Sequence, residues 1–321
     1  MRQRPPSANP VEELGDGSKI RVLDPASAGE TIVVQGAGLR APPTGGAAKL
    51  LVRAHPDALP FGRATLRAAQ AGDAYLAVPA GRLPWTLAQL HHALAPGAPL
   101  SGTFAARTGA GVPGGRRPPG RDPSSLDTDR LADIFDGAGF NRTSIEASDE
   151  ALSVSAFAAR TLPDFVAPGM RLLVCGLNPS LVAADAGYGF AGASNRFWKA
   201  AVGAGVLTRH RDPWNALEVH RVGMTDLVKR ATPRAVEVTP NEFRSGWRRV
   251  GRLAGWLTPD VVCFVGLQGW RVAVNRRAVP GWQPERVGGV PAYVMPSTSG
   301  LNARSSLGDL TEHLRRAIGG P

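Results

Sequence analysis

The sequence predicts an α/β protein with two domains, and three observations support this. Apolar runs typical of buried strands alternate with segments of helical periodicity, as in folds built on parallel sheets. The chain has 321 residues, against roughly 150 for an average domain. The two halves also differ in charge: residues 1–166 hold 17 basic and 16 acidic residues, whereas residues 167–321 hold 20 and 10.

Composition shifts along the chain indicate the domain boundaries. The start is polar and lacks periodicity, and a later stretch is rich in glycine, proline and arginine. We therefore expect a disordered tail at 1–18, a first domain at 19–160 with a flexible insert at 107–125, a linker at 161–170 and a second domain at 171–321.

Strand and helix patterns alternate through the first domain, which predicts a parallel sheet. An apolar stripe of helical spacing is formed by Leu83, Trp85, Leu87, Leu90 and Leu94. Strands are expected at 20–24, 30–36, 49–54, 74–80 and 98–107. Helices are expected within 58–72, at 82–95 and at 126–140, the last ending at Gly137 or Gly139.

The second domain repeats the alternation. Thr239 and Glu242 form a capping box around Pro240, which predicts a helix from there to Leu257. Strands are expected at 171–179, 260–266 and 291–297, and further helices at 195–206, 267–277 and 305–317. In such sheets, ligands bind at the carboxyl ends of the strands.

Composition excludes several classes of protein. No apolar run approaches the ~20 residues of a membrane span, and the N-terminus lacks the apolar core of a secretory signal. Cys175 and Cys263 are too few for a disulfide scaffold, and both lie in apolar runs, which predicts buried thiols in a cytoplasmic protein. The basic second half favours a polyanion partner, although a GC-rich genome would enrich arginine equally.

Two strand-end loops carry the most distinctive motifs. The first runs Gly176-Leu177-Asn178-Pro179-Ser180 and continues to Gly187-Tyr188-Gly189-Phe190 and to Asn195-Arg196-Phe197-Trp198-Lys199; the second is Met295-Pro296-Ser297-Thr298-Ser299-Gly300-Leu301-Asn302-Ala303. With GMTDLVKR at 223–230, these motifs resemble the mismatch-specific uracil/thymine DNA glycosylases of the uracil-DNA glycosylase superfamily over about residues 170–316. The resemblance implies a three-layer α/β/α domain.

The resemblance also implies a reaction. A base must leave the helix before its glycosidic bond can be cut. Asn178 resembles the residue that orients the attacking water, which its neutral amide can position without acting as a strong base. By itself, an Asn-Pro pair would equally be a loop cap. Neither Gly176–Ser180 nor Met295–Ala303 contains a lysine for a Schiff base, so we expect hydrolysis without strand cleavage, and without a cofactor or metal.

Further residues of the first loop are expected to bind the base. Phe190 matches the position that stacks on the flipped base, although a single phenylalanine is more often core. Gly176, Leu177 and Tyr188 are expected around the base, and Ala183 is small enough to admit the 5-methyl group of thymine. Asn195 through Lys199 are expected to dock the loop.

The second loop resembles the element that enters DNA. Leu301 matches the wedge that fills the gap left by the flipped base, although a leucine before a helix is normally core. Ser299 and Gly300 would let the backbone approach phosphates, and Asn302 would contact the partner strand. Ser297-Thr298 stand where bacterial relatives carry Asn-Pro, and Ser180 stands where glycine is usual, which leaves the base preference open.

Other charged and titratable residues have weaker interpretations. The arginines of the predicted helix at 240–257 would bind phosphates or form a solvated face, and we favour the latter for Arg244, Arg248, Arg249 and Arg252. His210 and His220 lack the spacing of metal ligands.

The first domain resembles the later part of class I S-adenosylmethionine-dependent methyltransferases over about residues 20–155. The cofactor loop of that family is reduced to Gly36-Ala37-Gly38, so we expect a degenerate domain without cofactor.

Together these features predict a monomeric, nucleoid-associated glycosylase, without membrane contact, acting on double-stranded DNA with G·U or G·T mismatches. The alternatives are a catalytically weak mismatch- or damage-binding protein, and a nucleic-acid methyltransferase with an appended DNA-binding domain.

Overall fold

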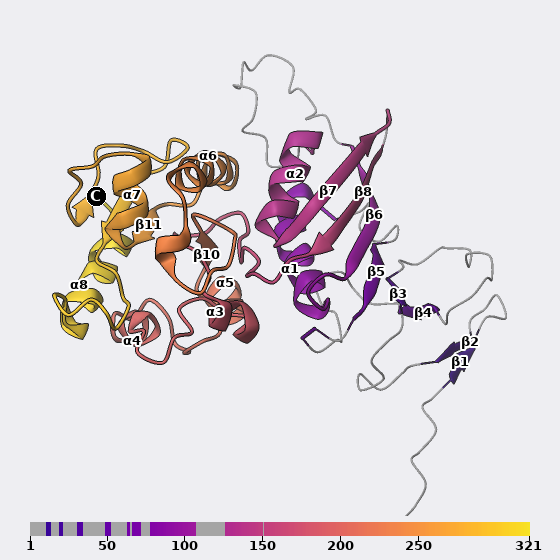
Figure 1. Cartoon of the computed structure of the whole chain (residues 1–321), viewed down its shortest axis with the longest axis horizontal. Coiled ribbons are helices and arrows are strands. Elements are labelled where there is room, and N and C mark those ends of the chain that lie inside the picture. The colour runs from indigo at the N-terminus through magenta and orange to yellow at the C-terminus, as the bar shows by residue number, and fades with distance from the viewer. Residues whose placement is uncertain are drawn as a thin grey trace, which may run out of the picture.

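The protein is described by a computed structural model in which two lobes lie side by side (Figure 1). It describes four short N-terminal strands as backbone and most of the chain beyond residue 62 in full. The described residues are 11–13, 19–21, 31–34, 49–52, 63–64, 66–71, 78–106, 126–149 and 151–321.

The N-terminal lobe contains a six-stranded sheet of order β4-β3-β5-β6-β8-β7 in the described residues. Its strands are β3 (Thr31–Val34), β4 (Lys49–Val52), β5 (Ala68–Ala71), β6 (Pro99–Ala105), β7 (Phe140–Ala147) and β8 (Ala151–Ala158). The first four are parallel, but β8 pairs antiparallel with both β6 and β7. The expected all-parallel sheet is therefore wrong at this edge, because β7 and β8 are joined by a hairpin too short for a crossover.

Two helices cover one face of this sheet (Figure 1). Helix α1 (Leu83–Ala93) begins with a proline in its first turn, and α2 (Thr128–Gly137) is capped by Asp127, whose side chain accepts from the amide of Arg130. These two helices confirm the predictions at 82–95 and 126–140. The helix expected within 58–72 is contradicted at Ala68–Ala71, which form β5.

Several sequence predictions fall partly or wholly outside the described residues. The insert at 107–125 and Gly36–Gly38 lie outside them, as does most of the tail at 1–18. Within that tail, Val11–Glu13 form β1, which pairs antiparallel with β2 (Lys19–Arg21), contrary to the expected disorder.

The C-terminal lobe is a three-layer α/β/α domain on a sheet of order β10-β9-β11-β13-β12. The strands are β9 (Leu172–Gly176), β10 (Val222–Asp226), β11 (Val262–Val265), β12 (Gly281–Trp282) and β13 (Ala292–Met295), and only β12 is antiparallel. Helices α6 (Pro240–Leu257) and α7 (Leu267–Ala273) pack together, as do α4 (Phe197–Gly203) and α8 (Leu307–Ile318) (Figure 1). The capping box at Thr239 is present as predicted.

The strand order places a crevice at the end of β9. The chain passes from β9 to β10 on one side and then to β11 on the other. The connection after β9 leads to one side and the connection from β11 to β13 leads to the other, and such switch points are where open α/β sheets bind ligands. Two short helices that the sequence did not reveal, α3 (Leu181–Ala186) and α5 (Pro213–Glu218), lie in the connection between β9 and β10.

Apolar contacts and ion pairs join the two lobes. Trp214 of α5 meets Trp85 of α1 edge to face, with ring centroids 4.6 Å apart. Arg252 of α6 makes two hydrogen bonds of 2.5 and 2.7 Å to Asp133 of α2. The segment proposed as a linker, 161–170, is largely buried at this junction.

Two further findings concern excluded classes. Cys175 and Cys263 are both free and buried, as predicted, and burial raises the pKa of the Cys263 thiol to about 12. None of the helices in the described part of the chain is long and apolar enough to span a membrane.

Candidate active site

A cavity of about 240 Å³ opens where β9 and β10 end. Its volume lies below the roughly 300–1,000 Å³ of pockets for drug-sized ligands and suits a smaller, flat group. Both strand-end loops border it, through Asn178 and Phe190 of the first and Ser299 and Gly300 of the second. The cavity is lined by Leu162, Gly176, Leu177, Asn178, Pro179, Ser180, Ala183, Gly189, Phe190, Ala191, Gly192, Ser194, Asn195, Asp226, Ser299 and Gly300.

The side chain of Asn178 is held in one orientation. Its Nδ2 lies 3.1 Å from the carbonyl oxygen of Arg230, 3.1 Å from that of Pro179 and 2.8 Å from Oγ1 of Thr232. Because the two carbonyl oxygens can only accept hydrogen bonds, the amide nitrogen must face them. The amide oxygen has no hydrogen-bond partner among the described residues, and Asn178 lines the cavity, so this oxygen is available to accept a hydrogen bond.

Phe190 provides an aromatic wall. Its ring stacks on Phe197 with centroids 4.1 Å apart and planes inclined by 23°. Its φ of 58° is in the left-handed region, which is costly for a bulky residue and marks a position imposed by its surroundings. The small side chain of Ala183 is buried on α3, which begins where the Ser180 hydroxyl accepts from the amide of Ala183.

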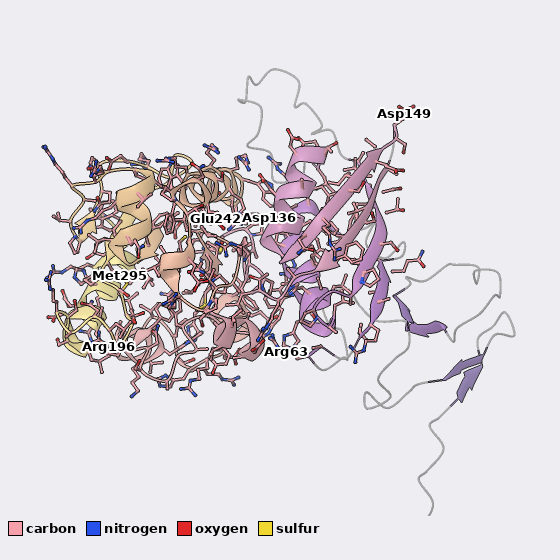
Figure 2. All side chains as sticks on the ribbon, in the orientation of Figure 1. Arg63, Asp136, Asp149, Arg196, Glu242 and Met295 are labelled. Atoms are coloured by element: carbon pink, nitrogen blue, oxygen red, sulfur yellow. The ribbon has the colours of Figure 1, made fainter. Side chains whose placement is uncertain are left out.

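Arg196 organises the second loop. The amide of Arg196 donates to the carbonyl of Thr298 at 2.9 Å, and its guanidinium donates to the carbonyls of Ser299, Asn302 and Ser305. Figure 2 places Arg196 in the C-terminal lobe, on the side away from the N-terminal lobe. The expectation that this segment docks the loop agrees with these contacts, since the guanidinium is engaged by backbone carbonyls.

The tip of the second loop carries an exposed leucine. Leu301 is 96% exposed, so it is not a core residue. A side chain at Gly300 would collide with Ser194, so glycine lets the second loop pack against the first. The amide of Asn302 donates to the carbonyl of Ser297 at 2.8 Å and its oxygen accepts from the amide of Arg304, so this side chain is engaged within its own loop.

Asp226 lines the cavity, and sequence reasoning missed it. It lies at the end of β10, beside Gly176 in the strand register, and burial raises its pKa to about 6. The residue is part of GMTDLVKR, which the sequence presented only as a family-like stretch. Its chemistry would have been visible had that stretch been recognised as a strand, because the carboxyl end of a strand next to β9 faces the same crevice.

Some predicted site residues lie elsewhere. Tyr188 is not among the residues that line the cavity, and its ring meets Trp198 edge to face at 6.4 Å. Lys229, which was not predicted to belong to the site, is buried and pairs with Asp164 at 2.8 Å, outside the cavity. Among the described residues, no group of three or more His, Cys, Asp or Glu side chains is arranged to hold a metal ion.

The arginines of α6 correct another expectation. Arg249 is neither solvated nor placed to contact phosphate, because its guanidinium is buried and donates to Asp164 at 2.6 Å. Arg252 pairs with Asp133 across the lobes. Arg244 and Arg248 are exposed and each donates to a side chain one turn away, as expected for a solvated face.

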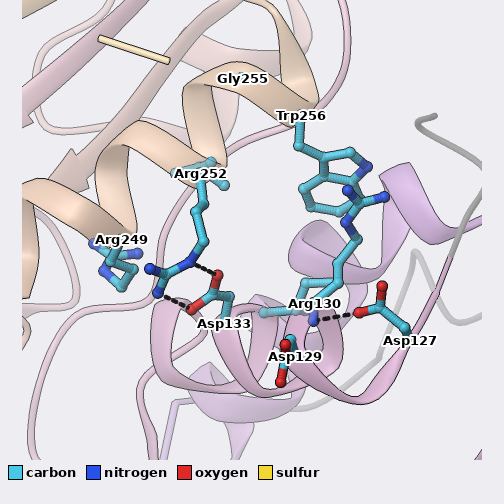
Figure 3. A pocket seen from close by; sticks show the side chains of 10 residues that line it. Asp127, Asp129, Arg130, Asp133, Arg249, Arg252, Gly255 and Trp256 are labelled. Atoms are coloured by element: carbon cyan, nitrogen blue, oxygen red, sulfur yellow. Dashed lines mark hydrogen bonds and ion pairs between the residues drawn. The ribbon is translucent and has the colours of Figure 1, made fainter. Parts of the chain in front are cut away.

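A second cavity, of about 290 Å³, lies between α2 and α6 (Figure 3). Asp127, Asp129 and Asp133 border it together with Arg130, Arg249 and Arg252, so its charges balance, and the guanidinium of Arg252 is paired with Asp133. The cavity at the strand ends differs in having two polar loops and one aromatic wall.

The fold and the cavity define the class of protein. A three-layer α/β/α domain holds a cavity of nucleobase size at its topological switch point, next to an exposed apolar loop tip. Residues 163–318 match the model of the Uracil DNA glycosylase superfamily. The C-terminal domain is therefore uracil DNA glycosylase-like.

Solved structures overlap partially with each half of the chain. A protein from Methanosarcina acetivorans, provisionally named a uracil DNA glycosylase, is 18% identical over 50% of this chain and 98% of its own, with a TM-score of 0.33. A SAM-dependent methyltransferase from Methanosarcina mazei is 12% identical over 40% of this chain and 92% of its own, with a TM-score of 0.30. The chain spans about half the length of two other matches, 44% of a candidate exported protein from Bordetella parapertussis and 56% of the [4+2]-cyclase SpnF.

Proposed function

We propose that the chain is a monofunctional DNA glycosylase that removes uracil from G·U mismatches in double-stranded DNA and, because Ala183 is small, thymine from G·T mismatches. The observation that carries the proposal is the meeting of Asn178, Phe190 and the Ser299–Gly300 backbone around one cavity. The match of residues 163–318 to a DNA glycosylase superfamily supports the same reaction.

In this proposal, the flipped base stacks on Phe190. Base–aromatic stacking contributes about 1–3 kcal/mol. Flipping the base costs a few kcal/mol of unstacking, and Leu301 offsets part of that cost by filling the vacated space in the duplex. Ser299 and Gly300 hold the backbone next to the extruded nucleotide.

Hydrolysis then needs one water molecule. The bond between C1′ and the base nitrogen breaks and its electron pair leaves with the base, so the sugar acquires oxocarbenium character. A water held by the free oxygen of Asn178 bonds to C1′, and its displaced proton leaves through solvent and is taken up by the base. The products are an abasic site and a free base, and no cofactor takes part.

The N-terminal lobe has a supporting role in this proposal. Residues 19–160 form the first unit and residues 171–321 the catalytic unit, which acts as a monomer associated with the nucleoid. The guanidinium groups of Arg63 and Arg160 contact α3, through the carbonyl of Ala184 and the carboxylate of Asp185 respectively. Since α3 carries Ala183, these contacts support one wall of the cavity.

A base-release assay tests the proposal. The intact chain is incubated in excess over duplexes containing G·U, G·T or A·U and over single-stranded uracil DNA, and the free base is quantified by mass spectrometry. We expect fastest release from G·U, slower release from G·T, and little from A·U or single strands. Tight binding of mismatched duplexes without any released base would instead indicate a mismatch-binding protein.

A further inference from the structure

Helix α3 connects two sides of the cavity at the strand ends. Its N-terminal cap, Ser180, comes two residues after Asn178, and its C-terminal cap, Gly187, comes three residues before Phe190. Ala183 lies between the caps and lines the cavity. The position of this one helix therefore sets the spacing of Asn178 and Phe190 and the place of the wall between them.

Helix α3 is too short to hold its position by itself. It has six residues, of which only Ala183 and Ala184 are buried. Isolated helices of this length are marginal in water, and two buried alanines contribute little hydrophobic stabilisation. The contacts made at the ends of α3 therefore decide where the helix lies.

The C-terminal end of α3 is capped from the other lobe. The amide of Gly187 donates to the carbonyl of Ala183 and closes the helix. The next carbonyl, that of Ala184, accepts a hydrogen bond from the guanidinium of Arg63, which lies at the boundary between the lobes (Figure 2). A helix leaves its last carbonyls without backbone partners, and a cation is favourable at that end, so Arg63 stabilises the end of α3.

Gly187 allows this close approach. Its φ of 80° lies in the left-handed region, which glycine adopts without strain. A Cβ built at this position would collide with Nη1 of Arg63. The turn that leads from α3 towards Phe190 and the contact with Arg63 therefore depend on the same glycine.

A second arginine holds the exposed side of α3. Arg160 donates to the two carboxylate oxygens of Asp185 at 2.7 and 2.5 Å. These hydrogen bonds lower the pKa of Asp185, and the charge of Arg63 acts in the same direction. Both arginines border a hollow of about 180 Å³ between α1 and α3. Their guanidinium groups therefore bridge the two lobes where apolar side chains leave a gap.

Both arginines are anchored in the N-terminal lobe. The amide of Ala64, which follows the first arginine, donates to the carbonyl of His92 at 2.9 Å. The carbonyl of Ala159, which precedes the second, lies 2.9 Å from Nε2 of His91. Because both histidines belong to α1, the position of this helix is passed on to α3 through the two arginines.

We propose that Arg63 and Arg160 are positioning residues for base excision, through which the N-terminal lobe fixes α3 and the spacing of Asn178 and Phe190. The inference rests on the proposed function. Neither arginine lines the cavity, so both act through α3. Misplacing a reacting group by about 1 Å can slow a reaction about 10²-fold. Loss of these contacts therefore lowers the excision rate and leaves the contacts with DNA intact.

Single-turnover excision from a G·U duplex tests this role. Arg63→Met removes the donor to α3 and should slow excision about tenfold, with unchanged duplex affinity in fluorescence anisotropy. Arg63→Lys keeps a cationic donor for a single carbonyl and should recover most of the rate. Arg160→Met should slow excision less, by about threefold, because the ion pair with Asp185 is exposed.

Arg67→Met is the matched control. Arg67 is an exposed arginine of the same lobe and does not line the hollow beside α3. This variant should keep the wild-type rate and affinity. Two results would overturn the inference: a wild-type excision rate in Arg63→Met, or a loss of duplex affinity that accounts for the slower excision, which would make Arg63 a phosphate contact.

Hydrogen exchange separates this inference from the proposed function, because it requires no reaction. Amide exchange of the intact, DNA-free chain is followed by mass spectrometry on peptides that cover residues 181–190. Faster exchange confined to these peptides in Arg63→Met and Arg160→Met supports the inference even if no base is ever released. Unchanged exchange there, or faster exchange throughout both lobes, refutes the positioning role and leaves the glycosylase proposal intact.

Discussion

The lobe junction and the cavity meet at the end of β10, and they hold a carboxylate in opposite ways. At the junction, Asp164 accepts hydrogen bonds from Arg249, Lys229 and Thr225 at 2.6, 2.8 and 2.7 Å. Burial would raise the pKa of Asp164, but the charges of Arg249 and Lys229 outweigh burial and lower it. In the cavity, the Asp226 carboxylate lacks such partners and its pKa rises to about 6.

The difference distinguishes a group that holds the fold from one that is available to a ligand. A buried carboxylate with three partners has its hydrogen-bonding capacity filled. A carboxylate left unpaired in a cavity costs stability, and such costs are concentrated at functional sites. The pairing of Asp164 therefore belongs to the architecture, whereas Asp226 lines the cavity and is available to a ligand there.

The largest stability effect is expected at the junction. Arg249→Met should lower the free energy of unfolding by about 3–5 kcal/mol, because it leaves the buried carboxylate of Asp164 with Lys229 as its only cation. Urea unfolding of the intact chain measures it. Arg248→Met removes an exposed arginine from the same helix and should change stability by less than about 0.5 kcal/mol. Equal losses in both variants would contradict the structural role of Arg249.

Asp226 should affect stability in the opposite direction. An acid whose pKa is raised on folding binds its proton more tightly in the folded state, so its ionisation destabilises the fold as the pH rises from about 4 through about 6. Asp226→Asn removes that ionisation. The variant should be more stable than the wild type at pH 8 by on the order of 1–3 kcal/mol and equally stable at pH 4.

Urea midpoints at the two pH values provide the measurement. Comparing the two proteins at each pH cancels the titration of groups they share, including Asp164. A variant that is less stable than the wild type at pH 8 would show that the Asp226 carboxylate has a stabilising partner and would remove its contrast with Asp164.

Much of the site follows from sequence because strand ends converge in α/β sheets. Asn178 and the Ser299–Gly300 segment each follow an apolar strand, so the rule of carboxyl-end binding brings them together. Asp226 was missed because its partner in the sheet, Gly176, is distant in the chain, and register is a tertiary property. Arg249 was misread because an arginine beside an apolar helix stripe is normally solvated.

For the fold, too, some elements were predicted from local signals in the sequence and others were missed. The long helix α6 was predicted from its capping box and apolar stripe, which are local signals. The hairpin β7–β8 was not predicted, although Leu152, Val154 and Ala156 alternate with Ser153 and Ser155 as in a half-buried strand. The position of Tyr188, outside the cavity, depends on its packing against Trp198.

The smallest effect is expected at the loop tip. Leu301→Ala should leave stability unchanged, because the side chain is 96% exposed, and should weaken binding to a G·U duplex about tenfold, roughly the value of one buried leucine. Binding to single-stranded DNA should not change. Val279→Ala alters another exposed aliphatic residue outside the cavity and should leave both affinities unchanged. Anisotropy titrations would contradict the wedge if Leu301→Ala weakened both forms of DNA equally.

The reaction itself is tested most directly at Asn178. Removing one positioned polar group from an active site slows catalysis by about 10²–10⁴-fold. Free uracil released from a G·U duplex is measured in a single turnover for the wild type and Asn178→Ala, with duplex affinity measured in parallel. We expect release by the wild type, a loss of at least about 100-fold in the variant, and equal affinities. Undiminished release by Asn178→Ala would show that another group positions the water and would refute the role of Asn178.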